Sequence, residues 1–359
     1  MIALVLPILL QAAAPAPPPA HVQNAQVTSR ALTAGGLRKE VETVGRSGAV
    51  SWLGYEQEVV DGSRQMCCFQ SLRSSRNRDG DRLCCGGCRL EQKGAFSIDS
   101  PGDRSVELER LRFFVLIRVA DGGVDRVRAL SEDCGIDAGG KPFAWLTGVT
   151  PPESLAFLRS LVGPFAKRGY DRNRAGEALA AIAAHAAPAA DDVLMDFLAP
   201  GHPVELRKQA AFWLGNSRGR RGLEALQASR SDADPAFRRD LTFSFSQSPL
   251  PEAVAELIAM AKNDADGGVR GQALFWLAQK AADRAAETIQ NAIRDDPDED
   301  VKKKAVFALS QLPREEGVAE LIRVARTNRN PEVRKQAVFW LGQSRDPRAL
   351  AFIEEILDR

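Results

Sequence analysis

The sequence predicts a mainly α protein, in which an α–α superhelix follows a small, mainly β, cysteine-rich domain. Three observations predict this fold class. A segment of twelve residues recurs five times in the second half of the chain, the first half changes to apolar residues in alternate positions, and all six cysteines fall in that first half. With 359 residues, the chain is long enough for two or three domains.

The repeated segment reads VRKQAVFWLGQS in its last copy, Val333–Ser344. A basic residue in one column sets the register of the five copies: Arg207, Arg238, Arg270, Lys302 and Arg334. The spacings between these residues are 31, 32, 32 and 32. Self-similarity at a fixed period of this size indicates a solenoid, in which each unit buries its apolar face against its neighbours.

Each copy predicts a pair of helices. In the last copy Val333, Ala337 and Leu341 recur at i, i+4 and i+8, which places them on one helical stripe. Asn330 precedes Pro331, the arrangement of an N-cap residue followed by a first-turn proline. A second amphipathic run, such as Arg348–Leu357, completes each unit. Because so small a helical unit is unstable alone, stacking must supply its core.

The pattern V-R-x-x-A-x-x-x-L-G-x at Val333–Gln343 has close versions at Leu206, Val269 and Val301. It resembles short bacterial HEAT repeats, similar to those of phycobilisome lyase-type proteins. The resemblance covers about residues 172–359 and implies a HEAT-like solenoid of about six repeats. The copy at Phe237–Ser248 departs most from the pattern, and Arg172–Leu198 fits loosely enough to be interpreted as a degenerate N-terminal cap.

One column of the repeats is aromatic in all five copies: Phe212, Phe243, Phe275, Phe307 and Phe339. It lies six positions after the first core residue, about 240° around the helix at ~100° per residue. Two interpretations remain open. Each phenylalanine packs sideways against the next repeat, or the column forms a half-exposed aromatic ladder that binds a partner. These five residues are the candidate partner-binding residues.

Two neighbouring columns suggest structural roles. The column after the phenylalanines alternates large and small residues, which suggests interlocking packing: Trp213, Ser244, Trp276, Ala308 and Trp340. The basic column could bind phosphate, but acidic residues are interleaved with it and the net charge of the chain is +1. Because nucleic-acid binding normally needs a basic face, we expect a solvated or salt-linked column and no nucleic-acid partner.

The first residues resemble a secretory signal peptide. Met1–Leu10 is apolar and an Ala/Pro-rich stretch follows it, so we assign residues 1–20 to a probable signal peptide. The apolar run is too short for an ordinary transmembrane helix, and we expect no stable membrane span after its removal. The expected location is periplasmic or secreted. The alternative is a short hydrophobic start on a cytoplasmic protein.

Residues 45–150 are expected to form the cysteine-rich β domain, with 21–44 a linker or N-terminal extension and 151–171 a connecting segment. Leu108–Leu130 contains two β-rich runs around Asp121-Gly122-Gly123, which predicts a hairpin. Trp52–Val60 is another expected strand. We recognise no family for this domain.

The six cysteines of this domain are disulfide candidates: Cys67, Cys68, Cys84, Cys85, Cys88 and Cys134. An even count in an exported protein predicts disulfides, and six cysteines allow fifteen pairings. Direct bonding of adjacent residues is geometrically awkward, so the first pair is expected to bond to the later cluster and to Cys134. A zinc site built from Cys67, Cys68, Cys84, Cys85 and Cys88 is a minor alternative.

No catalytic motif is present: the sequence contains no G-x-S-x-G, HExxH, P-loop or dinucleotide glycine pattern. His185 and His202 are expected to be structural or surface histidines. The sequence therefore favours a non-catalytic protein–protein interaction scaffold or adaptor of the bacterial cell envelope, without a cofactor. One alternative, implied by the resemblance, is a chromophore lyase or modification factor. Another is a thiol- or zinc-dependent sensor module coupled to a scaffold.

Overall fold

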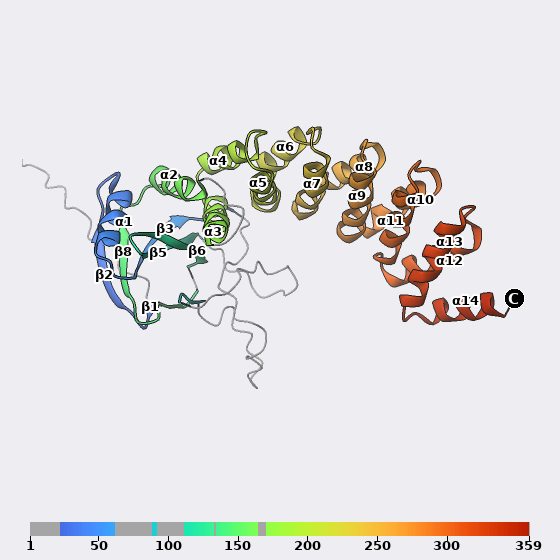
Figure 1. Ribbon diagram of the computed structural model, residues 1–359, viewed down its shortest axis with the longest axis horizontal. Coiled ribbons are helices and arrows are strands. Elements are labelled where there is room, and N and C mark those ends of the chain that lie inside the picture. The colour runs from blue at the N-terminus through green and yellow to red at the C-terminus, as the bar shows by residue number, and fades with distance from the viewer. Residues whose placement is uncertain (1–21, 62–87, 92–110, 133, 164–169, 359) are drawn as a thin grey trace, which may run out of the picture. The chain divides into compact units, whose positions relative to one another are not determined.

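The computed structural model describes residues 22–61, 88–91, 111–132, 134–163 and 170–358. The chain divides into two compact units, Met1–Ala190 and Asp191–Arg359. Within the described residues it forms eight strands and fourteen helices, and the last strand ends at Thr147. Figure 1 shows the large sheet in the blue-to-green, N-terminal part of the chain. The fold is thus mainly helical, with a sheet in its N-terminal part, as the sequence predicts.

A mixed five-stranded sheet forms the centre of the first unit, in the order β2-β8-β3-β5-β6. Its strands are β2 (Gln26–Ala31), β3 (Ser51–Glu58), β5 (Arg112–Ala120), β6 (Gly123–Ser131) and β8 (Pro142–Thr147). Strand β8 runs parallel to β2 and β3, whereas β3, β5 and β6 are antiparallel. A second, small sheet joins β1 (Val22–Gln23), β7 (Ile136–Asp137) and β4 (Cys88–Arg89).

The predicted hairpin is confirmed, because β5 and β6 pair through a two-residue turn at Asp121 and Gly122. Both turn residues have positive φ, 50° and 81°. This combination is that of the type I′ turn, whose twist matches that of the flanking strands. The expected strand Trp52–Val60 is also present, as β3.

The structure corrects the expectation of a linker or N-terminal extension over residues 21–44. Residues 26–31 form β2, which pairs with β8 over its whole length, and residues 36–46 form α1 (Gly36–Arg46). Leu37, Val41 and Val44 of α1 are buried. The sequence hides β2 because it is an edge strand that exposes five of its six residues, so it carries no apolar alternation.

The solenoid also starts later than residue 172. Helices α2 (Pro151–Val162) and α3 (Tyr170–Ala184) belong to the first unit, and α3 packs on β6 and α2. Arg174 donates to the carbonyl of Val124 at 2.9 Å, and Glu177 accepts from the backbone N–H of Val127 at 3.0 Å. Residues 151–171 are therefore more than a connecting segment. Helix α3 belongs to the first unit, where it packs on the sheet, and its alanine-rich sequence suits a sheet-packed helix as well as a repeat.

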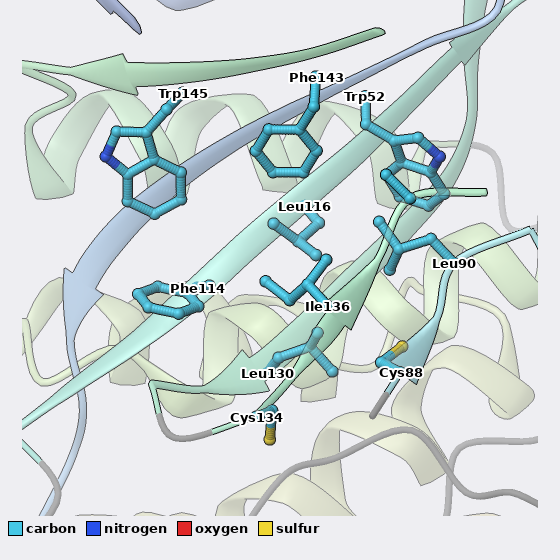
Figure 2. Close-up of a cluster of buried hydrophobic side chains, with 11 residues drawn as sticks. Trp52, Cys88, Leu90, Phe114, Leu116, Leu130, Cys134, Ile136, Phe143 and Trp145 are labelled. Carbon is cyan, nitrogen blue, oxygen red and sulfur yellow. The ribbon is translucent and has the colours of Figure 1, made fainter. Parts of the chain in front are cut away.

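One face of the large sheet carries an aromatic cluster, which Figure 2 shows. Trp52 and Phe143 lie in it, and the rings of Phe114 and Trp145 meet edge to face at 5.2 Å. The indole of Trp52 donates to Glu91 at 2.8 Å, so its polar atom is satisfied at the edge of the cluster.

Three buried polar side chains form hydrogen bonds on the opposite face of the sheet. Tyr55 points to that face because successive side chains of β3 alternate between the two faces. The hydroxyl of Ser154 in α2 is 2.9 Å from the Tyr55 hydroxyl and 2.9 Å from Nε2 of His185. All three residues are buried, and burial raises the pKa of Tyr55. These hydrogen bonds link β3, α2 and the residue that follows α3, so His185 has a structural role.

The second unit consists of helical hairpins, which Figure 1 shows following one another to the C-terminus. After α4 (Ala189–Leu198), the first helix of each pair is here called the A helix: α5 (Val204–Ser217), α7 (Pro235–Gln247), α9 (Gly267–Lys280), α11 (Glu299–Ser310) and α13 (Pro331–Gln343). The second is the B helix: α6 (Gly219–Ala228), α8 (Glu252–Asn263), α10 (Ala282–Asp295), α12 (Arg314–Thr327) and α14 (Pro347–Leu357). Consecutive A helices contact each other.

The local signals in the repeats are confirmed. The Asn330 side chain caps α13 by accepting from the backbone N–H of Glu332 at 2.9 Å. Val333, Ala337 and Leu341 are fully buried. The predicted stripe is therefore the core-facing side of the A helix.

The closeness of α5 and α7 gives a first prediction. A Cβ on Gly215 would collide with the carbonyl oxygen of Ser244 in α7, whereas a Cβ on Gly342, in the same column of the last repeat, meets nothing within 4 Å. Gly215→Ala should destabilise the protein by about 1–3 kcal/mol, because overpacking moves the backbone. Gly342→Ala should instead stabilise α13 by up to about 1 kcal/mol. Denaturant unfolding of both variants measures this contrast, and equal stabilities would contradict the packing.

Candidate interaction surface on the repeat unit

The five predicted phenylalanines lie in a continuous row of aromatic rings along the A helices. Together with the tryptophans of the next column they form the aromatic ladder: Phe212, Trp213, Phe243, Phe275, Trp276, Phe307, Phe339 and Trp340. Seven ring contacts join these eight rings. The ladder therefore crosses all five helical pairs of the second unit.

The contacts within the ladder repeat every two helical pairs. The rings of Phe212 and Phe243 stack with 5.7 Å between their centroids and an interplanar angle of 11°. Those of Phe275 and Phe307 stack at 5.6 Å and 6°. Between these stacks, Phe243 meets the indole of Trp276 at 4.8 Å. Both geometries are favourable for aromatic pairs.

The alternation of large and small residues explains this doubled period. Each of the indoles of Trp276 and Trp340 packs on the phenylalanine of the preceding repeat, Phe243 or Phe307. The small residues of the same column, Ser244 and Ala308, are buried. The column of alternating tryptophans and small residues thus serves the packing of neighbouring repeats, as its pattern suggests.

The ladder is also partly open to solvent. Phe339 is 53% exposed, and Phe212, Phe243, Phe275 and Phe307 are each half-buried. By contrast, Phe237 and Phe245, in the core columns of α7, are fully buried. Sideways packing and partial exposure therefore occur together in the phenylalanine column. Partner binding by this column stays a prediction.

Three residues of the basic column form ion pairs with aspartates. Arg238 donates to the two carboxylate oxygens of Asp264 at 2.9 and 2.8 Å, and Arg270 does the same to Asp296 at 2.8 and 2.9 Å. Arg207 pairs with Asp232. Such forked pairs are the strongest side-chain hydrogen bonds in proteins.

A further contact joins each repeat to the one before it. Arg238 also donates to the backbone carbonyl of Asp232 at 2.7 Å, and Arg270 to that of Asp264 at 2.8 Å. Each arginine thus bonds a carboxylate at the end of its own repeat and a carbonyl at the end of the preceding repeat. We call this set of bonds the Arg–Asp network, and it fixes the register of neighbouring repeats.

The network changes chemistry in the fourth repeat. The arginine position holds Lys302, and the residue 26 positions later is Asn328, where Arg238 and Arg270 have Asp264 and Asp296. Lysine lacks the planar fork that bonds both oxygens of a carboxylate. In this repeat the arginine and its aspartate partner are therefore both replaced. The sequence pattern shows the basic column, but only the recurring offset of 25 or 26 residues could have revealed its acidic partners.

The carboxylates of the network are held in their charged form. Burial acts to raise the pKa of Asp264, but the hydrogen bonds from Arg238 and from the backbone N–H of Asp266 outweigh it, so the pKa is lowered. The pKa of Asp296 is lowered by the same balance, with Arg270 as the donor. The arginines of the first three repeats are therefore neutralised by their own carboxylates.

The B helices present a different surface, in which charges pair across repeats. Arg220 bonds Glu252 at 2.5 Å, and Arg230, just after α6, bonds Glu256 at 2.8 Å. Arg326 pairs with Glu355 in the last two B helices. These pairs thus join neighbouring B helices, whereas the aromatic ladder lies on the A helices. The last B helix, α14, also exposes apolar side chains: Leu350, Ile356 and Leu357.

Of the cysteines, only Cys88 and Cys134 lie within the described residues. Both are buried beside the aromatic cluster. Cys67, Cys68, Cys84 and Cys85 lie outside the described residues, so the pairing of the six stays a prediction. Across residues 22–61, 88–91, 111–132, 134–163 and 170–358, no three His, Cys, Asp or Glu side chains are grouped as metal ligands.

None of the helices in the described part of the chain combines the length and the apolar character that crossing a membrane requires.

Comparison with known proteins identifies the repeats. A family model described as HEAT repeats matches residues 285–359. No curated protein matches the chain. The repeats at the end of the chain are therefore HEAT repeats, as the motif predicts.

Several solved structures are similar to the chain. The complex of CpcE and CpcF of phycocyanin lyase from Nostoc sp. PCC7120 is 17% identical over 44% of this chain and 99% of the other, with a TM-score of 0.34. YibA of E. coli is 22% identical over 46% of this chain and 64% of the other, with a TM-score of 0.34. Kap95p, in a structure with RanGDP, is 17% identical over 54% of this chain and 30% of the other, with a TM-score of 0.37.

The Arg–Asp network predicts unequal roles for equivalent basic residues. Arg270→Ala should lower the free energy of unfolding by about 2–4 kcal/mol, because it leaves the buried Asp296 carboxylate without its charged partner. Lys302→Ala, at the same position one repeat later, should cost less than about 1 kcal/mol. Urea unfolding of the two variants measures both values. Equal losses would show that the network does not hold the repeats in register.

The lowered pKa values of Asp264 and Asp296 predict acid sensitivity. In the folded protein both pKa values lie below the ordinary value of 3.8, so the carboxylates contribute stability above that pH. This contribution is lost as the pH falls through the lowered folded pKa values. The thermal midpoint should therefore drop below about pH 4. The double variant Asp264→Asn with Asp296→Asn should be less stable at pH 7 but lose less on acidification. If the wild type and the double variant lose the same stability on acidification, the two aspartates are not the origin of the acid sensitivity.

Proposed function

We propose that the protein is a non-catalytic scaffold that binds a partner protein through the aromatic ladder. The observation that carries this proposal is the continuity of eight partly exposed rings along the A helices. Contiguous apolar surface on a soluble protein usually marks an interaction site. Phe212, Phe243, Phe275, Phe307 and Phe339 are the contact residues of this proposal.

The physical state of the rings suits binding. Phe275 is held between the stacked ring of Phe307 and the edge of Trp276, so its rotamer is already fixed. A partner therefore gains aromatic contact area while few side chains lose freedom. Arg220, Arg230 and Arg326 on the B-helix side are already paired with glutamates, which makes them a poorer source of binding free energy.

We further propose that the scaffold works in the cell envelope. The apolar residues 1–10 fit a signal peptide, although they lie outside the described residues. The disulfide state of Cys88 and Cys134 fits an oxidising compartment, where such bonds persist. A disulfide sulfur is not a zinc thiolate, so the state of Cys88 favours disulfides over the zinc alternative.

The ladder can be tested with peptides selected from a displayed library on the purified full-length chain. Phe339→Ala should weaken the selected peptides by about tenfold or more, since an aromatic anchor typically contributes over 1 kcal/mol. Its thermal midpoint should stay near that of the wild type, because the ring is 53% exposed. Leu350→Ala is the matched control, since that side chain is also exposed, at 59%, but lies on α14 outside the ladder.

Two outcomes would contradict the proposal. If the selected peptides bind Phe339→Ala and Phe275→Ala with the same affinity as they bind the wild type, the binding site lies outside the ladder. Unfolding of the Phe275→Ala and Phe307→Ala variants would show that the ladder is core. Addition of a bilin to the purified protein distinguishes the scaffold from the chromophore-lyase alternative. A scaffold leaves the absorption band of the bilin unshifted, whereas a lyase shifts it.

A further inference from the structure

The last A helix of the described chain nearly repeats the sequence of the first. Helix α5 contains the segment RKQAAFWLG, and α13 contains RKQAVFWLG, which differs from it in one residue. The rings are arranged alike as well. Phe212 meets Trp213 edge to face with 5.0 Å between centroids, and Phe339 meets Trp340 in the same way at 5.1 Å. The two helices therefore present the same side chains to whatever follows them.

Helix α5 uses these side chains to hold α7, the next A helix. Lys208 of α5 bonds the carboxylate of Asp240 at 2.5 Å. Phe212 stacks on Phe243, with 5.7 Å between the ring centroids. Asp240 and Phe243 are three residues apart, so they lie on one face of α7. That face thus offers a carboxylate for the lysine of α5 and a ring for its phenylalanine.

A glycine lets the two helices come close together. A Cβ on Gly215 of α5 would collide with the carbonyl oxygen of Ser244 in α7. Helix α13 has Gly342 in the same position, where a Cβ would meet nothing within 4 Å. Glycine makes a helix less stable than alanine does. Packing within the described chain therefore does not account for Gly342, whereas the close approach of another helix does.

The equivalent groups of α13 are open to a partner. Lys335 is exposed and forms no ion pair with any residue of the described chain. Phe339 is 53% exposed, and among the described rings it contacts only that of Trp340. Val338 is half-buried, whereas Val306 in the same position of α11 is fully buried. Within residues 170–358, α13 thus has the face that holds a helix in α5, with no helix on it.

We propose that this outer face of α13 binds an amphipathic helix of a partner protein, which lies against α13 as α7 lies against α5. The inference rests on the proposed scaffold function and names the part of the ladder and the kind of partner. The partner helix carries an acidic residue that pairs with Lys335. Three positions later it carries an aromatic residue that stacks on Phe339, followed by a small residue beside Gly342. Recognition of a helix by side chains at such spacings is a common mode of binding.

A second copy of this chain does not fit the face. The segments in which a small residue follows the stacked ring lie in α7 and α11, where Ser244 and Ala308 are buried within the repeats. The open face of a second copy would instead present Trp340 in the position of the small residue. The large indole would hold the two helices apart. The occupant is therefore a helix of a different protein.

The test is calorimetric titration of a stapled helical peptide with the sequence of residues 234–248 into the full-length protein. Gly342→Ala should weaken its binding about tenfold or more, because the added Cβ blocks close approach. The thermal midpoint of this variant should not fall, since that Cβ meets nothing in the free protein. Gly123→Ala in β6 is the matched control. Its Cβ also meets nothing within 4 Å, and it should bind the peptide like the wild type.

A charge exchange tests the polar contact. A peptide with Asp240→Lys should bind the wild type about fivefold more weakly, because it brings a second cation to Lys335. The protein variant Lys335→Glu should restore the affinity for that peptide. A peptide with Phe243→Ala should bind about tenfold more weakly than the parent peptide, since it lacks the ring that stacks on Phe339.

The outcomes separate this inference from the scaffold proposal. Binding that weakens in Gly342→Ala and is restored by the charge exchange supports it. Equal binding to the wild type and Gly342→Ala overturns it, because the peptide then lies elsewhere, such as in the place of α7. A dimer of the protein alone that Gly342→Ala dissociates in sedimentation also overturns it, since the occupant is then a second copy.

Failure of the peptide has two distinct meanings. If the peptide does not bind while library peptides still depend on Phe339, the inference falls and the scaffold stands. If no ladder-dependent peptide is found either, both fall.

Discussion

The register between neighbouring repeats is the constraint on which the rest of the second unit depends. A single helical pair cannot bury its apolar stripe, so each repeat folds only against the next. The Arg–Asp network sets that fit, because Arg238 and Arg270 each bond a carboxylate of their own repeat and a carbonyl of the preceding one. Displacement by one residue would break both bonds.

This register places the aromatic ladder. Once Val333, Ala337 and Leu341 face the core, a residue six positions after Val333 must lie on the flank of the A helix, between the neighbouring helix and solvent. Phe275 and Phe307 therefore stack on each other across two repeats while staying partly exposed. The same geometry brings one phenylalanine ring per repeat into a single row. The partly exposed aromatic row is thus a consequence of stacking.

Much of the fold could be predicted from sequence, and the failures have physical reasons. Repeat period and capping revealed the helical pairs, and the Asp121-Gly122 turn revealed the hairpin, because these signals are local. Strand β2 exposes nearly all its side chains, and the alanines of α3 suit a sheet or a repeat equally, so neither could be assigned without the tertiary structure. The phenylalanine column was predictable as a ladder. The Arg–Asp network could not be assigned from sequence, because its partners lie 25 or 26 residues apart.

Hydroxyl-radical footprinting of the full-length protein tests most directly whether the ladder is presented at the surface. The oxidation rate of each phenylalanine is measured by mass spectrometry. Phe339 should be oxidised fastest, and Phe212, Phe243, Phe275 and Phe307 at intermediate rates. The buried Phe237 and Phe245 should be almost unreactive. Ladder phenylalanines as protected as Phe237 would mean that the column belongs to the core, and the surface described above would not exist.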